Sequence, residues 1–275
     1  MTNIHRNDEP GFQKFTSAYG NKRQQFGEFY LPEQSGVHPV VILIHGGFWR
    51  APHGLSLMSG LAEDLVQRGI AVWNIEYRRV GDPGGGWPGT LQDVARAADY
   101  LKRLAKTFPI DLQRVVAVGH SAGGHLALWL AARRQFKPGS ILTRTTPPLE
   151  LVGIISQAGV SDLTIAWHEH LGGDAVVEFL GGELDEVPER YTEASPTSFL
   201  PLGLPQVLIH GTDDTRVPLS MSQSYLAHAI EAGDDVHLIT LEGADHFVVI
   251  DAASLAWKQT VSEIESLLEP ASEHL

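Results

Sequence analysis

The pentapeptide Gly119-His-Ser-Ala-Gly123 constrains the fold of this chain more than any other feature. It directly follows an apolar run, residues 114–118, and directly precedes a helix-like run, residues 124–132. A serine in this setting lies on a sharp turn between a buried strand and a helix, and the flanking glycines avoid collisions with both elements. The turn lifts the Ser121 hydroxyl out of the sheet and aims the Ala122 N–H at the same point. The pattern therefore predicts a nucleophilic serine at the end of a buried strand.

Apolar runs alternate with helical patterns along most of the chain. Residues 40–44 form a continuous β-branched run, which is typical of a strand buried on both faces. This alternation predicts one domain, residues 1–275, of the α/β class: a mostly parallel central sheet flanked by helices on both faces. Strands are predicted at 25–31, 40–44, 70–75, 115–118, 151–155, 206–209 and 236–241, and helices at 57–67, 90–106, 122–132, 221–231 and 252–268.

Three segments break this rhythm. Residues 1–20 have no clear period and are expected to be irregular, and residues 135–150 are expected to form a long loop. Residues 159–204 separate two strands by far more than a minimal crossover, so they are expected to form a small cap over the carboxyl edge of the sheet, where open α/β sheets place their sites. Within the regular part, Thr90 and Asp93 have the spacing of a capping box and predict the start of a helix.

A second motif, His45-Gly-Gly-Phe-Trp49, follows the strand at 40–44. Attack on a carbonyl builds negative charge on its oxygen, and the loss of one backbone N–H donor that faces this oxygen typically costs about 3–4 kcal/mol. Glycines let backbone rather than side chains line such a site. The predicted oxyanion donors are the N–H groups of Gly47, Phe48 and Ala122. His45 is expected to anchor the loop by hydrogen bonds and not to act as a base.

The two motifs together resemble those of the α/β-hydrolase superfamily, over residues 25–268. Within the superfamily, His-Gly-Gly-x-Trp followed by Gly-His-Ser-Ala-Gly is similar to the esterase branch that includes kynurenine formamidases. It is also similar to feruloyl and acetyl esterases and to hormone-sensitive-lipase-like carboxylesterases. Phe48 stands where the hormone-sensitive-lipase group has a third glycine, which favours the formamidase-like branch. The resemblance implies catalysis with no cofactor and no metal.

The resemblance also implies the acid and the base that a serine nucleophile needs. In this fold the chain order is serine, then acid, then histidine. The run His210-Gly-Thr-Asp-Asp-Thr-Arg-Val-Pro218 matches the acid loop of the family and assigns the acid to Asp214, with Asp213 as a turn residue. His246, in the loop after the last strand, is then the base.

Aromatic residues fall on several loops that should converge on the site. Trp49, Trp87 and Phe247 are predicted to contact the substrate through an aromatic pocket. His168 and His170 flank Glu169 on a predicted cap helix, and their spacing indicates a solvated face rather than a metal site.

Composition excludes several classes of protein. The chain of 275 residues has a formal net charge of −13, which disfavours nucleic acid as a partner, and its lack of cysteine excludes disulfides and thiolate sites. No apolar stretch approaches the length of a membrane span. The first ten residues lack the apolar core of a signal peptide, so a cytoplasmic location is expected. The oligomeric state is left open, with a homodimer as one alternative.

The motifs favour a serine hydrolase that cleaves carboxylic esters of small molecules through an acyl-enzyme. Hydrolysis of N-formylkynurenine, an amide, uses the same residues and is the closest alternative. A non-catalytic ligand-binding protein of the same fold is the alternative from another class, and the complete set of Ser121, Asp214 and His246 argues against it. The sequence does not indicate the acyl chain length.

Overall fold

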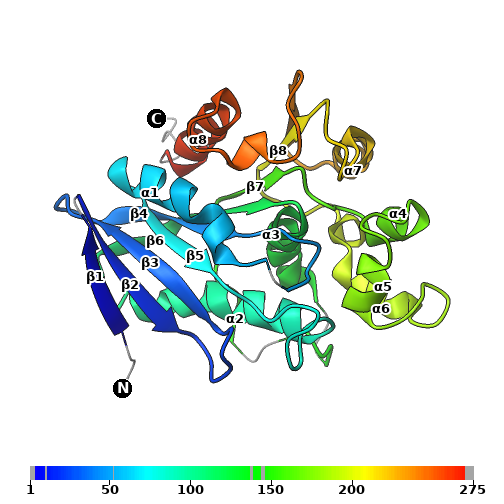
Figure 1. The fold of residues 1–275 in the computed structure, drawn as a ribbon, viewed down its shortest axis with the longest axis horizontal. Helices are drawn as coiled ribbons and strands as arrows, with labels where there is room; N and C mark the ends of the chain where they lie inside the picture. Colours follow the sequence, from blue (N-terminus) through cyan, green and yellow to red (C-terminus); the bar gives the residue numbers. More distant parts are fainter. Residues whose placement is uncertain (1–3, 10, 52, 137–138, 144–145, 270–275) are drawn as a thin grey trace.

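The computed structural model describes residues 4–9, 11–51, 53–136, 139–143 and 146–269. In these residues nine strands form one sheet of order β1-β2-β3-β5-β4-β6-β7-β8-β9 (Figure 1). Every neighbouring pair from β5 to β9 is parallel, so the predicted α/β class with a mostly parallel sheet is confirmed. The strands are β1 Ile4–Glu9, β2 Phe12–Ala18, β3 Phe26–Pro32, β4 His38–Ile44, β5 Ala71–Ile75, β6 Ile110–His120, β7 Gly153–Gln157, β8 Gln206–Gly211 and β9 Val236–Leu241.

The amino-terminal strands differ from the prediction. β1 and β2 pair antiparallel, β2 pairs antiparallel with β3, and β3 joins the parallel part of the sheet through an antiparallel contact with β5. The expectation that residues 1–20 are irregular is therefore wrong for most of this segment. The apolar residues Phe12 and Phe15 are three apart and lack the period of two, so pairing with β3 rather than a local pattern makes β2 a strand.

The central strands are buried on both faces because their side chains alternate between two cores. In β4, Val40, Ile42 and Ile44 contribute to one core, whereas Val41 and Leu43 contribute to the other. Helices α2 and α3 cover the first core, and α1 and α8 cover the second (Figure 1). The longer helices are α1 Ser59–Gln67, α2 Gly89–Leu104, α3 Ala122–Ala132, α7 Leu219–Ala232 and α8 Leu255–Leu268.

Helix α2 begins without the predicted capping box. Its first residue is Gly89, and no side chain caps its N-terminus. Asp93 is fully buried and accepts hydrogen bonds from Arg78 and from the Gln25 amide. The Thr90 hydroxyl donates to the carbonyl of Arg78. Both polar residues therefore fasten the loop after β5 to α2, which the local spacing did not reveal.

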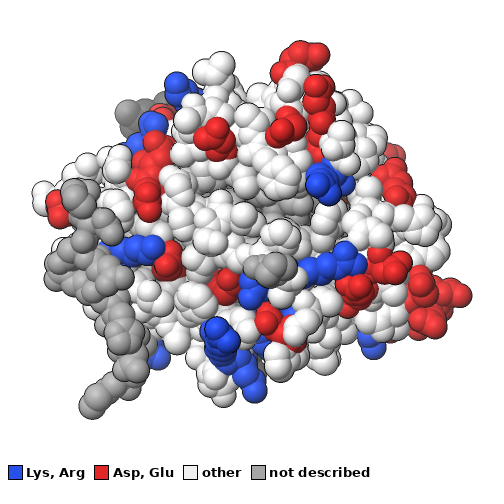
Figure 2. Space-filling model, in the orientation of Figure 1, with Lys and Arg blue, Asp and Glu red and all other residues white. Residues whose placement is uncertain are grey.

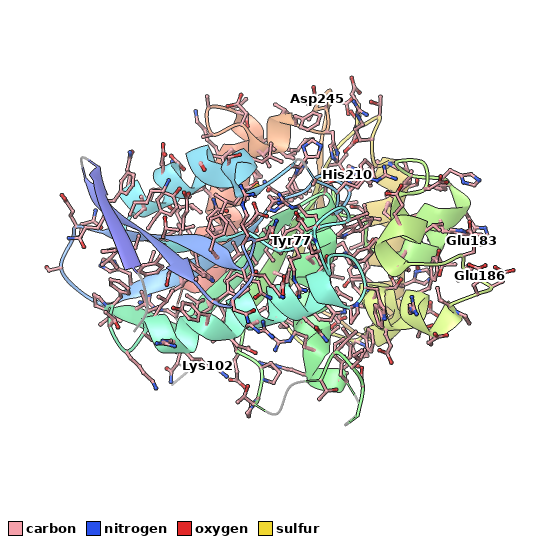
Figure 3. All side chains as sticks on the ribbon, turned by 60° about the horizontal axis from the view of Figure 1, so that its bottom comes forward. Tyr77, Lys102, Glu183, Glu186, His210 and Asp245 are labelled. Atoms are coloured by element: carbon pink, nitrogen blue, oxygen red, sulfur yellow. The ribbon has the colours of Figure 1, made fainter. Side chains whose placement is uncertain are left out.

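Three short helices, α4 Leu163–His168, α5 Ala175–Leu180 and α6 Pro188–Ala194, lie between β7 and β8. They pack beside α3, at the right of Figure 1. The Trp129 indole of α3 donates to the carbonyl of Glu193, 3.0 Å away. Figure 3 shows Glu183 and Glu186 at the outer rim of this segment. Among the described residues, no helix is long and apolar enough to cross a membrane.

Candidate active site

Ser121 lies on a sharp turn between β6 and α3. Its backbone has φ 57° and ψ −122°, a conformation that non-glycine residues rarely adopt and that clusters at functional sites. The Ser121 N–H donates to the carbonyl of Gln157 on β7, 2.8 Å away. A Cβ at Gly123 would lie 2.0 Å from the carbonyl oxygen of Ile44. Only glycine at 123 therefore lets α3 start this close to the end of β4.

His246 and Asp214 meet beside this turn. The His246 Nδ1–H donates to Asp214 Oδ2 over 2.6 Å, and Asp214 Oδ1 accepts from the N–H groups of Arg216 and Val217. With the proton held on Nδ1, Nε2 of a neutral His246 ring is an acceptor. Ser121 and His246 line the same cavity of about 200 Å³. The structure thus brings together the three residues that the sequence predicted for the triad.

His210, at the end of β8, is a further contact of Asp214. Its ring is fully buried, with Nε2 2.9 Å from the Val217 carbonyl and 3.3 Å from Asp214 Oδ2, and Nδ1 2.7 Å from the Ser222 hydroxyl. Figure 3 shows His210 inside the molecule. Burial alone would raise the pKa of Asp214, but hydrogen bonds from His210, His246 and the Val217 N–H outweigh burial and hold that pKa well below its ordinary value. Asp214 is therefore ionised across the neutral range.

His120, directly before Ser121, holds the backbone of His246. Its Nε2–H donates to the carbonyl of His246 over 2.8 Å, and the two imidazole rings lie 4.6 Å apart. Burial, together with the neighbouring His246, lowers the pKa of His120 to about 3. A neutral His120 adds no positive charge next to the His246 ring.

The glycine loop after β4 packs directly against the serine turn. A Cβ at Gly46 would lie 2.7 Å from the His120 carbonyl and 2.9 Å from the Ser121 Cβ. Gly47 and Phe48 then follow with φ 111° and 49°. No hydrogen bond joins the N–H groups of Gly47, Phe48 or Ala122 to any residue that the structure describes. Gly47 and Phe48 line the cavity, so their amides are available to a ligand there.

His45 anchors this loop from below. Its Nε2 lies 2.9 Å from Glu76 Oε1 and its Nδ1 lies 2.8 Å from the Gly46 carbonyl. The Tyr77 hydroxyl donates to the His45 carbonyl, and the two rings stack with centroids 4.2 Å apart. His45 therefore has the anchoring contacts that the sequence predicted.

Trp49 lies away from the cavity. Its side chain is fully buried, stacks on Phe179 of α5 with ring centroids 4.6 Å apart, and donates its indole N–H to His125 Nδ1 over 3.2 Å. The His125 Nε2–H donates to the Ala194 carbonyl, so His125 links the glycine loop, α3 and α6. The prediction that Trp49 contacts the substrate is wrong for this arrangement because Phe179 occupies its face.

Of the other two predicted aromatic contacts, one reaches the cavity. Trp87 packs against the core, and its backbone N–H donates to the Phe179 carbonyl, so the structure does not bring it to the cavity. Phe247 lines the cavity and is about half exposed. Its place directly after His246 explains why the sequence could identify it.

Other residues of the cavity wall were not predicted. His53 and Leu57 come from the segment after the glycine loop, and Arg216 comes from the acid loop. No described residue between 159 and 204 lines the cavity. A larger surface hollow of about 800 Å³ lies along α2 and contains none of the cavity residues. Among the described residues, no group of three or more histidine or acidic side chains could hold a metal ion.

Residues 28–229 match the model of the BD-FAE family, which is more than half of the chain. The chain belongs to the BD-FAE family. The matched segment includes the glycine loop, the serine turn and Asp214, whereas His246 follows it. The predicted membership of the α/β-hydrolase superfamily is confirmed.

Curated relatives include esterases and a formamidase. A probable isoprenylcysteine alpha-carbonyl methylesterase from Oryza sativa subsp. japonica is 26% identical over 237 residues, which cover 83% of this chain and 56% of the relative. A kynurenine formamidase from Aspergillus versicolor is 28% identical over 221 residues, covering 67% of this chain and 73% of the relative. The chain thus spans about half the length of the methylesterase.

A solved structure shows the same fold. A truncated form of a carbohydrate esterase from gut microbiota superposes with a TM-score of 0.81, covers 96% of this chain and 99% of the other, and is 21% identical. At this identity the likeness establishes the α/β-hydrolase fold alone.

The contact of Gly46 with the serine turn gives a first prediction. Gly46→Ala should lower kcat/KM for a short ester by at least about tenfold, because the new Cβ displaces the glycine loop or the serine. Steady-state kinetics and the melting temperature check this. Gly60→Ala is the matched control, since a Cβ there meets only the Ala252 side chain at 4.0 Å. Equal activity of Gly46→Ala and the parent would show that the close packing of Gly46 against the serine turn is not needed for activity.

The buried His125 gives a second prediction. Burial lowers its pKa to about 4, so the folded chain keeps it neutral, whereas the unfolded chain binds a proton below about pH 6.5. Its contribution to stability is complete above pH 6.5 and declines as the pH falls towards 4. His125→Gln should therefore show a smaller fall in melting temperature between pH 7 and pH 4.5 than the parent. Parallel curves in calorimetry would show that His125 does not take part.

Proposed function

We propose that this chain is a serine hydrolase that cleaves carboxylic esters of small molecules through a Ser121-His246-Asp214 triad and an acyl-enzyme. The observation that carries the proposal is the shared cavity. It contains the strained serine, the histidine bound to a buried carboxylate, and two backbone amides without partners among the described residues. The methylesterase relative supports the ester as the bond cleaved.

In the first step His246 Nε2 takes the Ser121 Oγ proton while Oγ forms a bond to the substrate carbonyl carbon. The carbonyl oxygen becomes an oxyanion, which the N–H groups of Gly47, Phe48 and Ala122 stabilise. His246 then gives the proton to the leaving oxygen, and the carbon–oxygen bond breaks to release the alcohol. Asp214 keeps the proton on Nδ1 and stabilises the charged ring.

In the second step water repeats this path. His246 removes a proton from the water as its oxygen attacks the acyl carbon, and the same amides stabilise the oxyanion. The proton returns to Ser121 Oγ as its bond to the acyl carbon breaks. The carboxylic acid product leaves, and Ser121 and His246 return to their starting protonation states. The cycle needs no cofactor.

The small cavity favours small substrates. Its volume of about 200 Å³ is below the roughly 300–1,000 Å³ that drug-sized ligands require. We further propose that residues 159–204 act as a cap and do not form part of the cavity wall. The cap fixes the glycine loop, residues 45–49, which we also call the oxyanion loop. Phe48 packs against Gly172, and Arg50 pairs with Glu178 over 2.5 Å.

Hydrolysis of a formamide is the second candidate, favoured by the kynurenine formamidase relative. The same residues can cleave an amide, because His246 can protonate a leaving amine. Turnover of 4-nitrophenyl acetate and of N-formylkynurenine by one preparation separates the two candidates. A kcat/KM for N-formylkynurenine well above that for the ester would replace the ester proposal with the formamidase.

Ser121→Ala should abolish the covalent route. We expect kcat to fall by at least about a thousandfold while the fold is kept, because the residual rate comes from oxyanion binding alone. Hydrolysis of 4-nitrophenyl acetate and circular dichroism check the two parts. Full activity in Ser121→Ala would refute the assignment of Ser121 as the nucleophile. A folded parent without activity on any ester or formamide would instead favour the non-catalytic ligand-binding alternative.

Asp214→Asn should reduce kcat by about ten-thousandfold, since an amide cannot hold the Nδ1–H tautomer of His246. Asp213→Asn is the matched control, because the exposed Asp213 accepts a side-chain hydrogen bond from its neighbour Thr212 and has none with His246. It should keep activity within about twofold. Equal effects of the two substitutions would contradict the assignment of the acid.

A further inference from the structure

Arg216 is a cavity residue that the mechanism does not use. It lies on the acid loop, and its side chain is exposed at the cavity wall. Its backbone N–H donates to Asp214 Oδ1 over 2.8 Å, so the main chain of Arg216 is fixed relative to the triad. The guanidinium forms no hydrogen bond or ion pair with any residue in the described part of the chain.

Arg216 lacks an acidic partner among the described residues, whereas several other arginines of this acidic chain have one. The chain has 33 acidic and 20 basic side chains. Arg50, Arg78 and Arg133 each pair with a carboxylate. No aspartate or glutamate is among the described residues that line the cavity, so nothing there neutralises the charge. Figure 2 shows acidic groups along the upper edge, at the right-hand end and, beside basic groups, on the left and lower parts of the visible face, whereas its centre is mostly uncharged.

The order of the strands places Arg216 on one side of the serine. The oxyanion loop follows β4, Ser121 follows β6, and the loops with Arg216 and His246 follow β8 and β9. Because β6 lies between β4 and β8 in the sheet, Arg216 and the base flank the serine on the side opposite the oxyanion loop. His246 must reach the leaving oxygen to protonate it. The leaving group therefore lies on the Arg216 side.

We propose that Arg216 binds a carboxylate on the leaving group. The preferred substrates are then hydroxy acids whose hydroxyl group is acylated and whose carboxylate is free. This inference rests on the proposed ester hydrolysis at Ser121. A guanidinium presents paired N–H donors that match the two oxygens of a carboxylate. The bond cleaved and the path of the proton are those of the ester reaction, and Arg216 only positions the substrate.

Matched esters test the proposal. 4-Acetoxybenzoate carries the carboxylate on the leaving group, and 4-acetoxybenzamide is its neutral counterpart. The measured quantity is the ratio of kcat/KM for the acid to kcat/KM for the amide. Arg216→Ala should lower this ratio by about tenfold, Arg216→Lys should retain part of it, and added salt should lower it in the parent. Arg23→Ala, which removes the same charge from the exposed loop between β2 and β3, should not change it.

Three outcomes overturn the inference. The first is a ratio that Arg216→Ala leaves unchanged. The second is a ratio that falls equally in Arg23→Ala, which would indicate a general effect of net charge. The third is an Arg216 effect confined to phenyl hydrogen adipate, measured against its neutral counterpart phenyl adipamate, because phenyl hydrogen adipate carries its carboxylate on the acyl side. A parent that hydrolyses neither the two acetoxy esters nor 4-nitrophenyl acetate would refute the proposed ester hydrolysis instead.

Binding of the product supplies a readout that does not depend on turnover. In the Ser121→Ala background, Arg216→Ala should weaken binding of 4-hydroxybenzoate by about tenfold and should affect 4-hydroxybenzamide much less. Isothermal titration calorimetry measures both. Equal affinities for 4-hydroxybenzoate with and without Arg216 would refute the carboxylate site even if ester hydrolysis failed.

Discussion

The close approach of three backbone segments at Ser121 is the constraint on which the site depends. A Cβ at Gly123 would collide with the Ile44 carbonyl, and one at Gly46 would collide with the His120 carbonyl. The glycines let the end of β4, the serine turn and the start of α3 lie together without intervening side chains. Because the glycine loop and Ser121 share this contact, the packing of β4, the serine turn and α3 fixes their relative position.

Polar contacts then attach the remaining parts to this centre. His210 and His246 fasten the loops after β8 and β9 to one buried carboxylate, Asp214. On the other side, Trp49 and His125 join the glycine loop to α3 and to the segment between β7 and β8. Each buried histidine has oxygen or nitrogen partners, so these links are specific in geometry and resist rotation of the rings.

Features that depend on neighbouring residues could be predicted from the sequence. Features that depend on contacts between distant residues could not. The turn at Ser121 follows from glycine spacing, and the fold class follows from the alternation of strands and helices. The sequence does not reveal that Trp49 is buried, because the residue that covers it, Phe179, is remote in the sequence. β2 lacks its own period and takes its structure from β3. That the Arg216 guanidinium lines the cavity without an acidic partner among the described residues can be recognised only from the three-dimensional structure.

Labelling with a fluorophosphonate tests the central claim most directly, because it reports nucleophilic reactivity without any choice of substrate. The account predicts one adduct per chain, located on Ser121 by peptide mass spectrometry, with loss of esterase activity in proportion to labelling and no adduct in Ser121→Ala. Inactivation accompanied by an adduct on another residue, or sustained activity in a fully labelled protein, would contradict the account.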